Sequence, residues 1–403
     1  MNRYVIKKSN ATALCVVLFF ICLATMNMIN KYYYFTYIAF AFFCIFVNRT
    51  LRIKYVPVLS LLLLAVSWML FSPDAAVSTL SLIKPFTYLL CFLMGRGLFN
   101  DDLPEKKNAF KVFYLLVGVI AIGALIHYLL NWSINASDFE TRNTIDFWTQ
   151  STLSATGQAA IACFPLALAV ACLFFKNNKI IKILSFASLI VILGYNLILS
   201  GRTLIVLLLL AVAAAFLYKL IVQKDRRYKT LIVFLIIVLL VIFLYQIDLF
   251  EVKTTVEASP LYERFFGDYV TTDINEDERL EKKIKYIENI WSCIWGGNHL
   301  REKFEYAHDI FLDTLDEAGV FALIAVVAYI ISSFVNLIKC ITNRAFPFAL
   351  RQIVLCTYLT IYAEFMIEPV LQGMPWLFAS FCLIDGYVSY LVSENKSKAG
   401  VNE

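Results

Sequence analysis

Charged residues are scarce in this sequence. Asp, Glu, Lys and Arg make up 16% of its 403 residues, whereas soluble domains carry about 25%. Apolar residues make up 61%, and the mean hydropathy is +0.73. So few charges exclude an ordinary soluble domain and predict a protein of the lipid bilayer. The net charge of +5 follows from where the basic residues lie, so it does not indicate nucleic-acid binding.

The common catalytic and metal-binding motifs are also missing. The three histidines are scattered, and the sequence has no CxxC, HExxH, DxD, Walker or GxSxG motif. Nine of the ten cysteines lie within or at the end of apolar runs, which is typical of a small buried hydrophobic residue. We therefore expect no disulfide framework, no metal site and no cofactor.

Long apolar runs take the place of these motifs. A helix needs about 20 residues to cross the hydrocarbon core of a bilayer. The runs predict an all-α integral membrane protein with about 12 transmembrane helices, the first of which is a retained span and not a cleaved signal peptide. The segments are 11–29, 33–47, 55–72, 79–95, 110–130, 153–175, 180–199, 203–221, 230–247, 318–339, 352–369 and 375–393.

Basic residues are distributed unevenly over the connections between these runs. With the N-terminus in the cytoplasm, 23 lysines and arginines fall in cytoplasmic segments, and four fall on the other side outside residues 249–317. Lysine and arginine collect on the cytoplasmic side of membrane proteins. We therefore expect a multi-pass protein with both termini in the cytoplasm.

One long polar stretch, Leu249 to Glu317, interrupts the apolar runs. The chain is therefore divided into transmembrane helices 1–9 over residues 1–248, an extracytoplasmic loop over 249–307, transmembrane helices 10–12 over 308–393 and a cytoplasmic tail over 394–403. A second outer loop, Asn131 to Gln150, carries no recognisable motif and is interpreted as a solvated connector.

The middle of the long loop has a helical pattern. Five apolar residues recur at helical spacing between charged residues: Leu280, Ile284, Ile287, Trp291 and Ile294. This pattern predicts an amphipathic helix along the outer membrane interface, with a helix packed on its neighbours as the alternative. Asn275 is a candidate cap at its start, and Gly296-Gly297 ends it.

A second helical pattern begins near His308 and continues to about Lys339. At about 1.5 Å per residue, this helix is longer than the hydrocarbon requires, so its first turns are expected to stand in an outer vestibule. Asp309, Asp313 and Glu317 share one face of those turns. A solvated helix face is the simpler interpretation of these carboxylates.

Three arginines lie on the outer side near membrane depth: Arg202, Arg264 and Arg279. Arginine binds phosphate groups through paired N–H donors and keeps its charge when partly buried. Arg202 opens an apolar run, where a charge predicts a functional site unless it snorkels to the interface. Arg279 opens the amphipathic helix, whose N-terminus favours an anion, although the neighbouring acidic residues are alternative partners.

His308 is the candidate base, because histidine accepts a proton near neutral pH. It stands at the start of the helix that faces the predicted vestibule. Asp309 is its candidate orienting partner or an alternative base. His127 and His299 have no comparable sequence context.

Three stretches resemble the O-antigen ligase and O-antigen or capsule polymerase superfamily of polytopic membrane glycosyltransferases. They are LSGRTLIVLLL (199–209), DERLEKKIKYIENIWSCIWGGN (277–298) and HDIFLDTLDEAGVFALI (308–324). They are similar to the family's Ser-Arg motif, its Arg-plus-helix segment and its His-Asn-x-x-Leu…Glu-x-Gly segment. Twelve spans with one large outer loop between spans nine and ten also match. This sequence has Asp309 where the family has Asn, and Gly296-Gly297 where the family has Gly-x-Gly.

The resemblance implies a GT-C-like fold and a metal-independent glycosyltransferase of the bacterial cytoplasmic (inner) membrane. The donor would be an undecaprenyl-diphosphate-linked glycan. Arg202 and Arg279 would hold its diphosphate, with Arg264 as a reserve contact. His308 would act near the acceptor, with Asp309 as its partner or as the base.

The leading hypothesis is a polysaccharide polymerase that transfers the glycan to a lipid-linked repeat unit, with a chain-length regulator as an additional partner. An O-antigen ligase that transfers the glycan to lipid A-core is the first alternative. A lipid-oligosaccharide flippase or transporter is the second, with Glu364, Glu368 or Asp385 as coupling groups.

Overall fold

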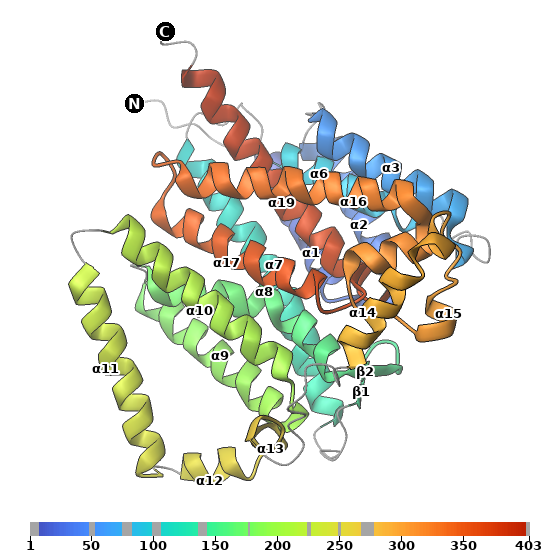
Figure 1. Cartoon of the computed structure of the whole chain (residues 1–403). Coiled ribbons are helices and arrows are strands. Elements are labelled where there is room, and N and C mark those ends of the chain that lie inside the picture. Colours follow the sequence, from blue (N-terminus) through green and yellow to red (C-terminus); the bar gives the residue numbers. More distant parts are fainter. Residues whose placement is uncertain are drawn as a thin grey trace, which may run out of the picture.

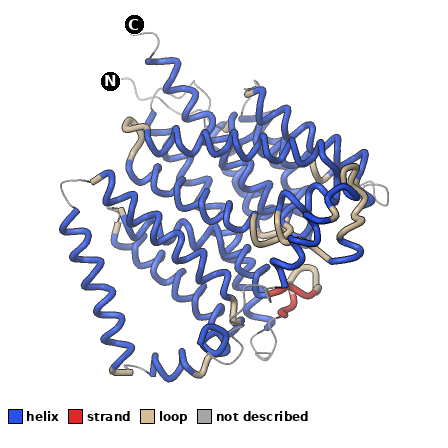
Figure 2. The backbone as a smooth tube through the Cα atoms, in the orientation of Figure 1, coloured by secondary structure: helices blue, strands red, loops and turns tan. Residues whose placement is uncertain are grey.

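A computed structural model of the chain describes residues 8–47, 53–74, 83–98, 106–135, 143–175, 178–223, 227–248, 251–266 and 278–399. For some residues inside these ranges, only the backbone is described. Helices make up nearly all of this part, together with one short antiparallel hairpin of two strands, β1 (Asn143–Ile145) and β2 (Thr152–Ser154) (Figure 2). The chain is therefore an all-α protein, with a small hairpin that the sequence analysis did not predict.

The first half of the described chain is a series of apolar helices. The helices up to the hairpin are α1 (Lys8–Thr25), η1 (Met28–Asn30), α2 (Tyr32–Phe42), η2 (Phe43–Val47), α3 (Tyr55–Phe71), α6 (Phe86–Gly97) and α7 (Lys106–Asn135). After the hairpin follow α8 (Ala155–Phe174), α9 (Lys179–Leu199), α10 (Arg202–Val222) and α11 (Arg227–Gln246).

The second half begins with short helices in the predicted long loop. These are α12 (Val252–Glu257), α13 (Pro260–Phe266), α14 (Glu278–Glu288), η6 (Ile290–Cys293) and α15 (Arg301–Phe304). Residues 249–250 and 267–277, which include the predicted cap Asn275, lie outside the described residues. The last elements are α16 (Ile310–Thr342), α17 (Phe348–Phe365), α18 (Val370–Gly373) and α19 (Pro375–Ala399).

A helix of the described chain overlaps each of the twelve predicted apolar segments. Six of the helices in this part are long and apolar enough to cross a membrane, and the apolar helices over 12–25, 32–47 and 55–71 are shorter. The membrane character of the chain is thereby supported. The count of twelve spans, the GT-C class and the orientation of the termini stay predictions. The six long segments are 109–135, 155–174, 179–199, 202–222, 310–342 and 375–393.

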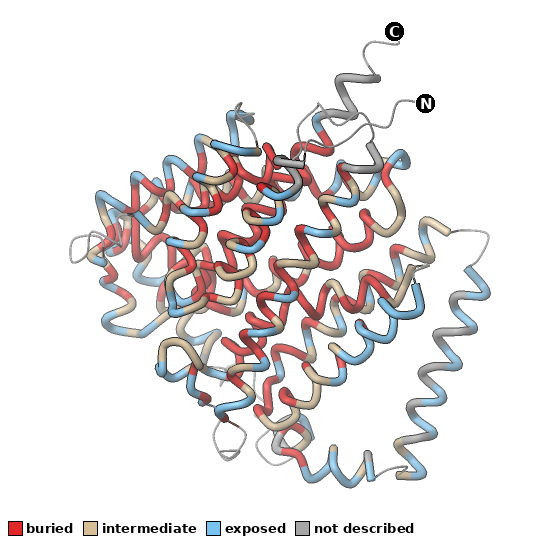
Figure 3. The backbone as a smooth tube through the Cα atoms, turned by 180° about the vertical axis from the view of Figure 1, so that it is seen from behind, coloured by how far each residue is buried: buried red, intermediate tan, exposed pale blue. Residues whose placement is uncertain are grey.

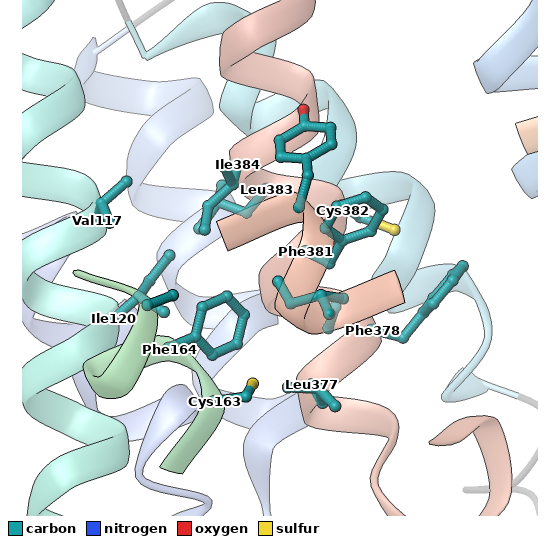
Figure 4. Packing of buried hydrophobic residues seen from close by; sticks show 14 of the residues in the cluster. Val117, Ile120, Cys163, Phe164, Leu377, Phe378, Phe381, Cys382, Leu383 and Ile384 are labelled. Carbon is teal, nitrogen blue, oxygen red and sulfur yellow. The ribbon is translucent and has the colours of Figure 1, made fainter. Parts of the chain in front are cut away.

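The core lies around α19, which packs against α6, α16 and α7. Figure 4 shows Phe164 of α8 beside Ile120 of α7, with Leu377 of α19 on its other side, and all three are buried. Glycine lets α19 approach α6 closely, since a Cβ on Gly95 would lie only 2.1 Å from the carbonyl oxygen of Leu383. Small residues allow such contact between membrane helices.

Large apolar side chains cover the outside of the helices. α9 exposes Ile183 and Leu184, and α11 exposes Leu235 and Leu239. Figure 3 shows the buried residues at the centre of the helix assembly and the exposed ones along these outer helices. A surface that exposes so much apolar area suits a lipid environment and would be unfavourable in water.

The two ends of the helix assembly differ. α14, α15 and the hairpin gather at one end, while the last turns of α19 project from the opposite end (Figure 1). α12 and α13 follow α11, and α13 packs against α9. The candidate residues of the long loop therefore gather at the hairpin end.

Candidate functional site

Helix α14 turns its apolar face away from the protein. Its exposed apolar side chains are those of Leu280, Ile284 and Ile287, and Trp291 in the 3-10 turn after it is also exposed. The opposite face holds the helix in place, since Tyr286 is buried and its hydroxyl donates to the Glu305 carbonyl at 2.5 Å. This arrangement agrees with the predicted interfacial helix. The predicted end at Gly296-Gly297 is wrong, because the α-helix ends at Glu288 and a 3-10 turn then leads to the two glycines.

A glycine junction joins this turn to a break in α16. Gly296, Gly297 and Gly319 all have positive φ angles, and Gly319 (φ 78°, ψ −176°) interrupts the helix. A Cβ on Gly319 would lie 2.8 Å from the Ile294 carbonyl oxygen, so only glycine fits there. Across the junction, Val320 N–H donates to the same Ile294 carbonyl at 2.8 Å.

The carboxylates on the first turns of α16 are buried, so the interpretation of a solvated face is wrong. Asp316 accepts the backbone N–H groups of Leu300 and Arg301 at 2.9 and 2.8 Å. Glu317 accepts from Ser72 and, at 2.9 Å, from Arg301. Asp316 thus satisfies the backbone N–H groups of residues 300 and 301, Glu317 binds the side chain of Arg301, and both fix that loop onto the helix.

His308 stands at the point where this loop enters α16. Its backbone has a φ of 57°, in the left-handed region that is uncommon for a residue with a side chain. Asp313 accepts the N–H groups on both sides of it, from Ala307 at 2.8 Å and Asp309 at 2.9 Å. The fold therefore holds the histidine in an unusual conformation with its side chain 24% exposed.

Asp309 caps the helix. One of its carboxylate oxygens accepts the N–H groups of Phe311 and Leu312 at 3.0 and 3.3 Å. The other lies 3.5 Å from the Lys283 ammonium. Lys283 also donates to the Met366 carbonyl at 2.9 Å, and thereby joins α14 to the C-terminal end of α17.

Arg279 lies one helical turn before Lys283 and reaches the same end of α17. Its guanidinium donates to the Ile367 carbonyl at 3.2 Å and to the Thr156 hydroxyl at 3.3 Å. Its Nη2 also lies 3.4 Å from Glu368 Oε1. The side chain is 35% exposed. Arg279 thus connects the loop to the start of α8 and to the turn after α17.

Glu368 brings two of the predicted site residues together. Its Oε1 faces Arg279, and its Oε2 lies 3.9 Å from His308 Nδ1. The carboxyl is buried, and the Arg279 guanidinium is its charged neighbour. From the sequence, Glu368 was a candidate only for the coupling group of a transporter. The sequence feature that pointed to it is a charged residue at the end of an apolar run.

Arg202 lies near this place without a described contact to Arg279. It is exposed and opens α10, which packs against α8. A Cβ on the preceding Gly201 would lie 3.6 Å from the Ala155 carbonyl oxygen, beside Thr156. Arg264 belongs to α13, but its side chain lies outside the described part, so its reserve role stays a prediction.

The structure therefore gathers Arg279, Lys283, His308 and Glu368 from three separate segments, with Asp309 beside them. The two basic side chains donate to the backbone carbonyls that follow α17. Arg279 is partly exposed, and guanidinium N–H groups also bind anions. The histidine lies on the other side of the same carboxylate. Arg279 and Lys283 can bind an anion at such a site, and His308 can accept the proton of a hydroxyl group.

No protein-family model matches the chain, and no curated protein matches it. The family resemblance therefore stays a prediction that rests on the three stretches around Arg202, Arg279 and His308.

Proposed function

We propose that the chain is a metal-independent glycosyltransferase that polymerises a polysaccharide at the outer face of the bacterial cytoplasmic membrane. It would transfer a glycan from undecaprenyl diphosphate to a lipid-linked repeat unit. The observation that carries this proposal is the meeting of Arg279 and His308 at Glu368, beside apolar helices. Arg279 is predicted to bind the donor diphosphate, and His308 is predicted to act near the acceptor. They lie 3.4 and 3.9 Å from the two oxygens of the same Glu368 carboxylate.

The donor side of the reaction needs positive charge. The bond between the sugar carbon and the diphosphate oxygen breaks, and the diphosphate leaves with the electron pair. Guanidinium and ammonium groups that are fixed before the reaction stabilise that developing charge. Arg279 and Lys283 supply two such groups from one face of α14. Arg202, at the start of α10, is the further candidate.

The acceptor side needs a base. The acceptor hydroxyl forms the new bond to the sugar carbon and gives its proton to His308, while the old bond breaks on the opposite face. This displacement inverts the configuration at the transferred carbon. Holding both substrates in one site supplies the orientation that the step requires.

The lipid parts of both substrates need an apolar environment next to the site. The exposed apolar face of α14 would lie in the membrane interface, which places Arg279 and Lys283, on its other face, at the depth of lipid headgroups. This position supports a lipid-linked substrate more than a soluble one.

Purified protein in detergent with a lipid-linked oligosaccharide tests the proposal. We expect Arg279→Ala and His308→Ala each to lower the rate of chain extension by about 100-fold or more. Lys282→Ala, on the same helix, and His299→Ala, an exposed histidine of the same loop, are matched controls that should keep wild-type rates. Full activity of both site variants would exclude the proposed chemistry.

The same assay separates the alternatives. Extension in detergent, without any gradient, is not expected of a transporter. In a deletion strain that makes lipopolysaccharide, loss of a polymerase leaves single repeats on the core, whereas loss of a ligase leaves bare core. We expect the single-repeat pattern on a gel.

A further inference from the structure

We infer that Glu368 is a positioning residue shared by Arg279 and His308: it holds Arg279 before the donor binds and aligns His308 once the diphosphate occupies Arg279. This inference rests on the proposed function and adds a residue that the sequence analysis did not assign to glycosyl transfer. Its basis is the geometry of one carboxylate with two oxygens and two different partners.

The two carboxylate oxygens of Glu368 face different residues. Oε1 lies 3.4 Å from Arg279 Nη2, and Oε2 lies 3.9 Å from His308 Nδ1. Both distances exceed those of tight charge-assisted hydrogen bonds, which are about 2.7–2.9 Å. Glu368 is therefore positioned between two partners and is tightly bonded to neither. A small movement of its side chain changes which partner it favours.

The Glu368 side chain is buried. It is 4% exposed, and a buried carboxylate needs a counter-charge or hydrogen-bond donors. Arg279 supplies the charge and remains 35% exposed, so an anion can approach it from outside. When diphosphate oxygens bind the guanidinium, they compete with Glu368 for it. Glu368 can then turn to the neutral imidazole of His308, whose Nδ1 lies 3.9 Å from its other oxygen and can donate a hydrogen bond to it.

A second glutamate, Glu364, lies one helical turn before Glu368. The Glu368 N–H donates to the Glu364 carbonyl at 3.0 Å, and the Glu364 side chain is completely buried. In the described part of the chain, neither Glu364 carboxyl oxygen has a hydrogen-bond partner. Glu368 differs from Glu364 because the guanidinium of Arg279 lies beside it and can balance a negative charge.

The consequence for the reaction is a fixed proton path. With Glu368 accepting from Nδ1–H, His308 presents Nε2 as the acceptor for the substrate proton. The hydroxyl proton moves to Nε2, the new glycosidic bond forms, and the diphosphate leaves with its electron pair. The carboxylate stabilises the imidazolium and does not itself take the proton, as in other histidine–carboxylate pairs.

Glu368→Gln tests this inference, because it keeps the shape of the side chain and removes its charge. Arg279 then loses its competing anion, so inorganic diphosphate should bind about tenfold more tightly than to wild-type protein. At the same time His308 loses its aligning carboxylate, so kcat should fall by about tenfold or more while KM for the donor falls or stays constant. A merely structural role would not raise anion affinity while lowering turnover.

Glu368→Asp is the second variant. It keeps the charge but shortens the side chain, so diphosphate affinity should stay near wild type while kcat falls, because the carboxylate no longer reaches His308. Glu305→Gln is the matched control, since Glu305 is an exposed carboxylate of the same loop that pairs with Lys282. It should change neither quantity. If Glu368→Gln does not yield folded protein, the Asp variant still decides the question through its kcat.

These measurements distinguish a wrong role for Glu368 from a wrong proposed function. Wild-type kcat and wild-type diphosphate affinity in both Glu368 variants, with inactive Arg279→Ala and His308→Ala, would overturn this inference alone. Wild-type activity in the Arg279 and His308 variants would overturn the proposed function as well. Tighter diphosphate binding with lower kcat in Glu368→Gln supports the shared role.

Discussion

At the scale of single residues, the aspartates in the first turns of α16 accept mainly backbone N–H groups. Asp313 and Asp316 each accept two N–H groups of the loop that carries His308. Asp309 caps α16 and faces Lys283. Glu368 differs from these, because its partners are the side chains of Arg279 and His308. This contrast favours Glu368 over Asp309 as the partner of the histidine.

The role of Asp309 can be tested by substitution. Asp309→Asn keeps the oxygen that accepts from Phe311 and Leu312, so we expect near wild-type stability and retained glycosyl transfer. Asp309→Ala removes the cap and should lower the free energy of unfolding by about 1 kcal/mol. Denaturation of the purified variants and the extension assay measure both effects. An inactive but stable Asn variant would show instead that Asp309 is the base.

At the scale of elements, the hairpin before α8 was not predicted. β1 (Asn143–Ile145) and β2 (Thr152–Ser154) pair antiparallel, and Asp146 binds buried His127 of α7 at 2.7 Å. The described part of the second outer loop is thus packed against the helices, and its interpretation as a solvated connector is wrong there. β2 leads directly to the start of α8, where Thr156 meets Arg279.

The Asp146 carboxyl gives this hairpin a pH dependence. Burial opposes its ionisation, but the hydrogen bond and charge of His127 and the hydrogen bonds of Thr149 lower its pKa to about 2. Because the folded pKa lies below the ordinary value of 3.8, the stabilisation is present above that value and is lost as the pH falls toward 2. This shift corresponds to at most about 2.5 kcal/mol of stability at neutral pH.

We therefore expect Asp146→Asn to lower the melting temperature at pH 7 and to lose this difference from wild type as the pH falls from about 4 to about 2. Thermal unfolding followed by intrinsic fluorescence measures it. Glu302→Gln, an exposed carboxylate of the long loop, is the control and should show no such trend. A constant difference at all pH values would mean that the ion pair does not stabilise the hairpin.

The sequence predicted the elements better than it predicted their contacts. Each apolar run forms a helix, because in lipid the backbone must satisfy its own hydrogen bonds. The start of the helix near His308 was also a local signal and was confirmed, whereas the amphipathic helix ends at Glu288 and not at Gly296-Gly297. Glu368 was missed as a site residue because its partners lie 60 or more positions away in sequence, and no local pattern records such pairing.

At the scale of the whole molecule, the distribution of exposed apolar residues agrees with a membrane protein, and the basic residues predict its orientation. The hairpin, α14 and α15 lie at one end of the helix assembly, and the last turns of α19 lie at the other (Figure 1). If the orientation is as predicted, the first end faces outward and the connection between α16 and α17 faces the cytoplasm.

Cysteine labelling tests this orientation. In a variant that lacks the exposed Cys15, Glu302→Cys on α15 should react with a membrane-impermeant maleimide in spheroplasts, and Arg344→Cys, after α16, should react only after permeabilisation. Both positions are exposed, so accessibility is limited by the membrane alone. The reverse labelling pattern would move the candidate site to the cytoplasmic side and remove the basis for a lipid-linked donor on the outer face.

The break at Gly319 has a consequence for how substrates enter. It leaves carbonyl groups of α16 outside the helical pattern, and those of Asp316 and Glu317 accept the N–H groups of Asn298 and Gly297 at 2.8 and 3.3 Å. Asp316 and Glu317 are buried, and a buried carbonyl group that loses its donor costs free energy. Lifting the loop like a lid would therefore leave the broken helix unsatisfied. We expect the loop to stay closed and lipid-borne substrates to arrive sideways, through the plane of the bilayer.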